Sequence, residues 1–373
     1  PQAEQPHPRK TPRLKQRLTL EALTQVFSDC ADFSARQLRL GGTGQIVTVC
    51  WLEGMAKTER LNDYVFRPLA QDRKLEAARG EAALALLVQG TLYAQKVKVE
   101  REMDPVAQGL IGGSCALFLQ GEKERALVIP VPTEEKRSIG QPENEPSLKG
   151  ARDSFVESVR TNTSLVRRRL RAPELKIVEC VAGRQSLTPV DILWLEGIAD
   201  PDTVDKVRRR IEDMDIDGIQ AAGNIEEYVI DRVDTPFPLI CYTQRPDRFC
   251  QGLLEGRVGI LCDGLALGHL LPGTIDQFFK TGQDRAYHWL VASMLSCVRY
   301  LCAVITLLVP GLYIALVTYH PEAIPVKLAL SIVSAKQEVP FSTVFEVLIM
   351  LVAFEILQEA GLRLPSTIGA TVS

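Results

Sequence analysis

Three glutamates lie in an otherwise apolar stretch near the end of the chain. The stretch covers residues 341–360 and contains Glu346, Glu355 and Glu359. Glu355 and Glu359 share one face of a helix because they are four residues apart, whereas Glu346 lies on roughly the opposite side. A bare carboxylate facing lipid costs about 2.5–3.5 kcal/mol, so such groups must pair, become protonated or line water. In an assembly of several copies around an axis, a ring of these glutamates would attract cations.

The same acids have a second interpretation. The stretch also fits an amphipathic helix lying in the membrane interface. Alternatively, the acids could pair with nearby basic residues, namely Lys327, Lys336 or Arg363. The sequence leaves the ion path and these structural roles open.

A second polar cluster follows an apolar run in the middle of the chain. Its members are Thr243, Gln244, Arg245, Asp247 and Arg248. Interfaces between α/β domains commonly hold small molecules, so these residues could form the polar wall of a ligand cleft or interface. A solvated turn after a strand explains the same residues.

Patterns typical of an active site are absent from the sequence. The four histidines are not spaced with Cys, Asp or Glu as a zinc site requires, and neither GxxxxGK[ST] nor GxSxG occurs. The glycine run at residues 41–44 precedes a strand and is typical of a tight turn. We therefore predict a protein that is not an enzyme and that holds no metal and no cofactor.

Composition narrows the class of protein further. The chain has 43 basic and 46 acidic residues in 373, so a nucleic-acid binder that depends on a global positive field is excluded. Hydrophobic residues make up 46% of the chain, which indicates a membrane portion joined to a charged soluble portion. The nine cysteines include no CxxC pair, and several lie in apolar runs, Cys302 among them. We predict that they are reduced and buried in a cytoplasmic protein.

Two blocks of sequence repeat at a single offset of 143 residues. Residues 47–56 end in WLEGMA and residues 190–199 end in WLEGIA, while the Gly-rich segments 109–121 and 252–264 keep the same register. Two separate clusters in one register indicate a duplicated subdomain. We interpret each WLEG as the end of a buried strand, with the glycine allowing the positive φ of the following turn.

The resulting plan is an α/β fold with two tandem copies followed by a helical membrane region. It has a basic flexible arm at 1–20, a first subdomain at 21–133, a linker at 134–150, a second subdomain at 151–275 and a membrane region at 276–373. Strands separated by helices favour a mainly parallel sheet with an antiparallel final hairpin in each copy. The second copy begins with a helix at about 153–171, which closes with a basic cluster: Arg167, Arg168, Arg169 and Arg171.

The membrane region begins with a stretch of residues that carries no charge. Residues 300–319 would span about 30 Å as a helix, which is the thickness of the hydrocarbon core. Pro310 predicts a kink in its middle, and residues 341–360 form a second spanning or re-entrant helix. Basic residues such as Arg299 precede the first span, so we expect the amino-terminal region to be cytoplasmic.

Four segments resemble a known family. The chain is similar to the GerA-type spore germination proteins, the A subunits of nutrient germinant receptors, and the stage V sporulation AF-like proteins share the same motifs. The resemblance runs from about residue 20 to the end, and it is carried by RDSFVESVRTNTSLVRRRL (152–170), PFPLICYTQRPDRFCQGLLEGRVGILCDG (236–264), LVPGLYIALVTYHPEAIP (308–325) and VPFSTVFEVLIMLVAFEILQEAGLRLP (339–365).

The resemblance implies a role in nutrient-triggered spore germination. It implies a place in the spore inner membrane with the soluble region on the core side, a B subunit and a C subunit as partners, and self-association into a ligand-gated cation channel. Relatives continue past the position of Ser373, so we expect a truncated membrane region. The alternative is a membrane-anchored receptor or scaffold that is not a channel and uses the duplicated domain to bind a small molecule.

Overall fold

The computed structural model describes most of the chain. The described residues are 14–40, 45–72, 75, 80–92, 97–122, 124–133, 153–231, 234–235, 237–279, 284, 287–336 and 340–363. The linker predicted at 134–150, the glycine run at 41–44 and the first thirteen residues of the arm lie outside them.

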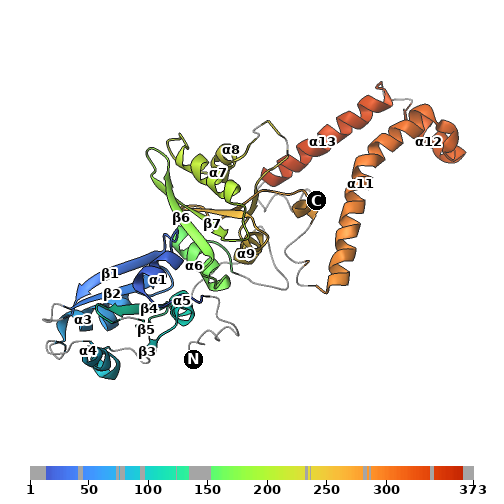
Figure 1. Cartoon of the computed structure of the whole chain (residues 1–373). Helices are drawn as coiled ribbons and strands as arrows, with labels where there is room; N and C mark the ends of the chain where they lie inside the picture. The colour runs from blue at the N-terminus through green and yellow to red at the C-terminus, as the bar shows by residue number, and fades with distance from the viewer. Residues whose placement is uncertain are drawn as a thin grey trace. The chain divides into compact units, whose positions relative to one another are not determined.

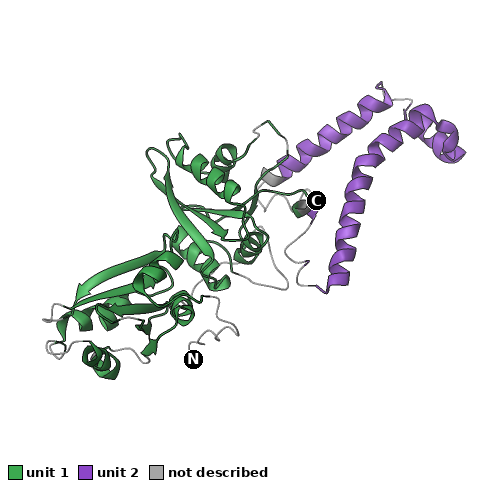
Figure 2. Ribbon diagram, viewed as in Figure 1, with its two compact units in different colours: residues 1–278 green, residues 279–373 purple. Residues whose placement is uncertain are grey.

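The chain forms two compact units, residues 1–278 and residues 279–373 (Figure 2). The first unit contains both sequence repeats, and the second contains the apolar helices. Within the segment predicted as an arm, Leu18 is buried and Leu14 packs against the core of the first copy. Residues 14–20 are therefore part of the first packed domain.

The first copy is a five-stranded sheet with helices on both faces (Figure 1). The order of its strands in space is β1-β2-β4-β5-β3. Its elements are α1 (Leu20–Val26), β1 (Phe33–Arg39), β2 (Ile46–Leu52), α2 (Thr58–Leu61), η1 (Asn62–Phe66), α3 (Arg67–Gln71), α4 (Glu81–Leu86), η3 (Leu87–Thr91), β3 (Lys98–Glu100), α5 (Met103–Ile111), β4 (Ser114–Leu119) and β5 (Ala126–Pro130).

The second copy repeats this arrangement. Its strand order is β6-β7-β9-β10-β8, which matches the first copy strand for strand. Its elements are α6 (Val159–Arg169), β6 (Leu175–Ala182), β7 (Thr188–Leu195), α7 (Pro201–Glu212), α8 (Ala222–Val229), β8 (Cys241–Thr243), α9 (Pro246–Leu254), β9 (Val258–Cys262) and β10 (Gly268–Leu271). The predicted fold class, two tandem α/β subdomains followed by helices, is confirmed.

The expectation of a mainly parallel sheet is wrong. Within the described ranges, every pair of neighbouring strands in the two sheets is antiparallel. The β3–α5–β4 crossover does join strands that run in the same direction, but β5 lies between them in the sheet. In the second copy, β10 separates β8 from β9 in the same way. The helix between two strands therefore makes them run in the same direction, but it does not make them neighbours in the sheet.

Helices cover both faces of each sheet. Successive side chains of a strand point to opposite sides, so each strand contributes to the core on both faces. In β2, Val47 and Val49 face the core beneath α2–α4, whereas Cys50 and Leu52 face α1 and α5. The second sheet is covered by α7 and α8 on one face and by α6 and α9 on the other. The predicted positive φ of the two WLEG turns is confirmed, with Gly54 at +75° and Gly197 at +80°.

Helix α7 shows how local sequence sets these elements. The Asp200 side chain caps it by accepting a hydrogen bond from the Thr203 backbone N–H at 3.1 Å, and Pro201 occupies its first turn. Its buried residues Val204, Val207 and Ile211 are spaced by three and four, so a single stripe faces the sheet. The remaining faces carry charged side chains.

The nine cysteines are all free thiols. Burial raises the pKa of the Cys50 thiol to about 12, which makes it a poor nucleophile. The prediction that the cysteines are buried is wrong for Cys297 and Cys302, which are exposed. Both lie on α11, a helix whose apolar side chains form its outer surface rather than a core.

The second unit consists of helices. They are α11 (Trp289–Tyr319), η5 (Pro321–Ala323), α12 (Val326–Lys336) and α13 (Thr343–Arg363), and α10 (Asp276–Phe279) lies at the junction of the units. Among the described helices, only α11 is long and apolar enough to cross a membrane. It continues through Pro310 and begins eleven residues before the predicted span. Helix α13 occupies the predicted second stretch, and it contacts α11.

Candidate functional site

The polar cluster after β8 forms an ion pair within the second copy. The Arg245 side chain, only 3% exposed, donates from Nε and Nη2 to the two Asp247 carboxylate oxygens at 3.0 and 2.6 Å. Burial alone would raise the pKa of Asp247, but the hydrogen bonds and charge of Arg245, together with the charge of Arg169, lower it. The pair fixes the first turn of α9.

The neighbouring polar groups also have protein partners. The Thr243 hydroxyl accepts a hydrogen bond from the Arg245 backbone N–H at 3.1 Å, and the Gln244 carbonyl accepts one from the Phe155 N–H at 2.8 Å. Arg248 is half-buried on the next part of α9. The five predicted wall residues thus lie at the end of β8 and the start of α9, and the Gln244–Phe155 hydrogen bond joins them to the segment before α6.

A cavity of about 330 Å³ lies elsewhere in the second copy. It is lined by residues of α8 and of the segment before β8, including Glu226 and the exposed ring of Phe237. None of the five predicted wall residues lines this cavity. Burial raises the pKa of Glu226 above its ordinary range.

The two copies are joined by backbone hydrogen bonds between the edge of β6 and the turn that precedes β1. The Ala31 N–H donates to the Ile177 carbonyl at 2.7 Å, and the Ile177 N–H donates to the Asp29 carbonyl at 2.8 Å. The Lys176 ammonium adds hydrogen bonds to the carbonyls of Val26 and Ser28 at 2.9 and 3.0 Å. The edge of β6 is thus paired with the first copy along this length.

A buried ion pair lies beside this edge contact. Arg167 of α6 donates from Nε and Nη2 to the two Asp32 carboxylate oxygens, both at 2.8 Å, and from Nη1 to the Leu175 carbonyl at 3.0 Å. The two side chains are 0% and 1% exposed. Gly54 of the first WLEG turn lies so close to α6 that a Cβ atom there would be 3.1 Å from Ser164 Cβ. Protein atoms therefore fill this part of the boundary between the copies.

The sequence analysis missed this pair. It grouped Arg167 with the basic cluster at the end of a helix, whereas Arg167 is the largest fully buried side chain in the described structure. The small residues Thr163 and Ser164, one turn earlier on α6, were the available signal, because small side chains allow close approach of a neighbouring element. The partner Asp32 is 135 residues away in the chain.

A second buried network lies on the same helix. The Asp191 carboxylate, 0% exposed, accepts a hydrogen bond from the Thr163 hydroxyl at 2.6 Å and lies 3.9 Å from Arg160 Nη1. Arg160 also pairs with Glu179, the cross-strand neighbour of Asp191. Within the described part of the chain, Asp191 Oδ1 has no hydrogen-bond partner. Burial raises the pKa of Asp191 to about 6.

We predict that this carboxyl makes the first unit, residues 1–278, less stable as the pH rises. Because its pKa is higher in the folded than in the unfolded chain, the penalty is absent below about pH 4 and complete above about pH 6, at about 3 kcal/mol. In urea unfolding between pH 4 and pH 6, Asp191→Asn should remove this decline. Asp231→Asn is the control, since Lys206 lowers the pKa of Asp231. An unchanged slope in Asp191→Asn would contradict the assignment.

The three predicted membrane acids lie on α13 but differ in their surroundings. Glu346 Oε2 is 3.5 Å from the Lys336 ammonium, which also donates to the Thr343 hydroxyl at 2.5 Å. The pairing of an acid with Lys336, one of the alternatives raised by the sequence, is therefore present for Glu346. Glu355 and Glu359 are exposed on the second half of the helix.

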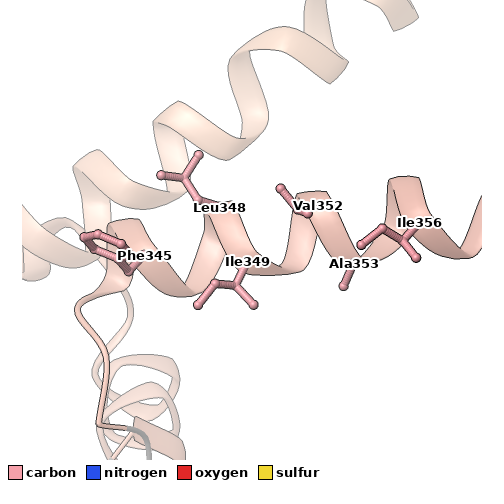
Figure 3. A pocket seen from close by; sticks show the side chains of 6 residues that line it. All are labelled: Phe345, Leu348, Ile349, Val352, Ala353 and Ile356. Carbon is pink, nitrogen blue, oxygen red and sulfur yellow. The ribbon is translucent and has the colours of Figure 1, made fainter.

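One face of α13 forms a shallow apolar groove of about 350 Å³ (Figure 3). Its lining side chains are Phe345, Leu348, Ile349, Val352, Ala353 and Ile356. Glu355 follows Val352 by three residues and Glu359 follows Ile356 by three, so both acids continue this side of the helix. Across the described residues, no group of three or more His, Cys, Asp or Glu side chains is placed to hold a metal ion.

Comparison with known proteins gives consistent matches along the chain. The sequence model of the Bacillus/Clostridium GerA spore germination protein family matches residues 21–373. The chain is 36% identical to the uncharacterized membrane protein YfkQ of Bacillus subtilis (strain 168), over 97% of this chain and 69% of that protein. It is 33% identical to spore germination protein KA of the same organism, over 92% of this chain and 62% of that protein.

A third relative and a solved structure agree with these matches. Spore germination protein B1 of Bacillus subtilis is 31% identical over 95% of this chain and 72% of that protein. The chain thus spans 62–72% of the length of these three relatives. The crystal structure of the N-terminal domain of the A subunit of the Bacillus megaterium spore germinant receptor GerK3 matches with a TM-score of 0.56 and 26% identity, covering 70% of this chain and 99% of that one. The duplicated α/β unit, the apolar helices and these matches together show that the chain belongs to the GerA family of spore germination proteins.

Proposed function

We propose that this protein is the A subunit of a spore germinant receptor and acts in nutrient-triggered germination as a subunit of an oligomeric, ligand-gated cation channel. The observation that carries the proposal is the family match over residues 21–373, which includes both the duplicated domain and the apolar helices. The structural relative is itself named as the A subunit of a germinant receptor.

The proposal places the protein in the spore inner membrane with residues 1–278 on the core side. Helix α11 supports membrane insertion, since its 31 residues carry a single charge, that of Arg299. The proposed partners are a B subunit, a C subunit and further copies of the same chain. In this arrangement the duplicated unit assembles and gates, and the helices contribute to the ion path.

Within the ion path, we assign the main role to Glu355 and Glu359. They lie on one side of α13 and are exposed, so neighbouring copies could bring them together around water. Glu346 has a different part because Lys336 balances its charge. Its ion pair with Lys336 holds the last residue of α12 beside the first turn of α13.

The test is potassium efflux from liposomes that contain the full-length receptor with its B and C subunits. Replacing Glu355 and Glu359 together with glutamine should lower nutrient-triggered efflux by about tenfold, because a ring of carboxylates attracts cations. Glu322→Gln is the matched control, since this carboxylate is exposed and lies outside α13, in η5.

Two results would contradict the proposal. Unchanged efflux after replacement of all three glutamates would remove their role in the ion path. Binding of amino acids or sugars to isolated residues 1–278 in calorimetry, without nutrient-triggered efflux from the full receptor, would favour the membrane-anchored receptor that is not a channel.

A further inference from the structure

The chain that precedes α11 contacts the helix far from its first residue. Arg299 donates from Nη1 and Nη2 to the two Asp284 carboxylate oxygens at 2.6 and 2.8 Å. Arg299 Nη1 also donates to the Phe279 carbonyl at 2.9 Å, and the rings of Phe279 and Tyr300 lie 4.4 Å apart. The Asp284 side chain is only 8% exposed, so these contacts enclose it.

These contacts fix the positions of Phe279 and Asp284 along the axis of α11. Helix α11 begins at Trp289, and Arg299 lies ten residues further on, or about 15 Å along the axis. Phe279 and Asp284 precede Trp289 in sequence but lie at the level of Arg299. Phe279 and Asp284 therefore lie beside the third turn of α11.

This level is incompatible with the hydrocarbon core of a bilayer. Irregular backbone exposed to lipid does not occur there, because its polar groups have no water to bind. Charged side chains are also costly at that depth. Asp284 and the Phe279 carbonyl must therefore lie in water or among lipid headgroups.

The length of α11 also indicates that the hydrocarbon core begins near Arg299. Its 31 residues extend over about 46 Å, whereas the hydrocarbon core is about 30 Å thick. The uncharged residues 300–319 alone are long enough to cross it. The surplus length corresponds to residues 289–299, which end at the residue that contacts Phe279 and Asp284.

We propose that the Asp284–Arg299 ion pair is a membrane-boundary clamp. It holds Arg299 and Tyr300 at the headgroup level of a phospholipid bilayer and keeps residues 289–298 outside the hydrocarbon. This inference does not depend on channel activity, since it concerns only where α11 enters the membrane. Asp284 and Arg299 act here as positioning residues.

Two native cysteines make the boundary measurable. Cys297 and Cys302 lie on either side of Arg299, and both are exposed on α11. The full chain is inserted into phosphatidylcholine–phosphatidylglycerol liposomes as two variants, each retaining one of these cysteines and lacking the other, with Cys241→Ser in both. A membrane-impermeant maleimide is applied from the side of residues 1–278, and the six buried cysteines serve as the background.

We expect Cys297 to react at least about tenfold faster than Cys302, since thiolate chemistry requires water. Equal reaction rates, or protection of both residues, would overturn the proposed boundary. Labelling in detergent confirms that both thiols are reactive when lipid is absent.

The role of the clamp itself is tested by Asp284→Asn and Arg299→Leu. Without the pair, the apolar side chains of the first turns, among them Trp289 and Met294, are free to enter lipid, so labelling of Cys297 should fall several-fold. The matched control is Glu322→Gln, at the other end of the helix. If Cys297 remains equally reactive in both variants, the ion pair does not set the boundary.

Discussion

Replacing Arg167 with leucine is expected to destabilise the first unit, residues 1–278, by about 3–5 kcal/mol, because the substitution leaves the buried Asp32 carboxylate without its partner. The guanidinium makes two hydrogen bonds to Asp32 and one to the Leu175 carbonyl, and neither charged side chain reaches solvent. The measurement is urea unfolding of residues 1–278, followed by tryptophan fluorescence from Trp51 and Trp194.

Two further variants separate the charge effect from a packing effect. The double variant Asp32→Leu/Arg167→Leu should recover most of the lost stability, since replacing a buried ion pair by apolar residues is often close to neutral. Arg168→Leu is the matched control, because it changes the adjacent and more exposed arginine and should cost less than about 1 kcal/mol. A double variant as unstable as Arg167→Leu would show that packing, not charge, dominates at this site.

Replacing Gly113 with alanine should also cost about 3 kcal/mol or more. Gly113 has a φ of +87°, a conformation that costs other residues about 1–2 kcal/mol. An added Cβ would lie 2.7 Å from the Met55 carbonyl oxygen and 3.1 Å from Pro132 Cα, both backbone atoms that cannot rotate away. Thermal unfolding of residues 1–278 would report the loss.

The control for this substitution lies in the next turn of the same copy. Gly121 has a φ of +96°, but a Cβ there would meet nothing within 4 Å. Gly121→Ala should therefore show only the conformational cost of about 1–2 kcal/mol. Equal losses in the two variants would mean that the close approach at Gly113 relaxes without cost.

The repeat was the feature most fully readable from the sequence. The glycines at 113 and 121 recur at 256 and 264, and all four have a positive φ. Turns and buried strands are specified by neighbouring residues, so copies of these residues give copies of the sheet. The order of the strands was not readable, because the insertion of β5 between β3 and β4 depends on contacts between distant segments.

The candidate sites also differ in whether the interacting residues are near or far apart in the sequence. Lys336 and Glu346 are ten residues apart, and their pairing was among the interpretations open from the sequence. Asp32 and Arg167 are far apart in the chain, and nothing near either residue identifies the other. The residues that Arg299 contacts, Phe279 and Asp284, are closer in sequence, but no local pattern predicts that they lie beside the third turn of α11.

The pairing of the β6 edge with the turn before β1 has a consequence for cleavage of the chain between the two copies. The hydrogen bonds of Asp29 and Ala31 with Ile177, and the Asp32–Arg167 pair, all cross between the halves without passing through the connecting segment. A half separated from its complement would expose a lone buried charge and an unpaired strand edge. Two fragments produced by cleavage between the copies are therefore expected to bind each other non-covalently, and the domain would behave as a split protein that reassembles from its parts.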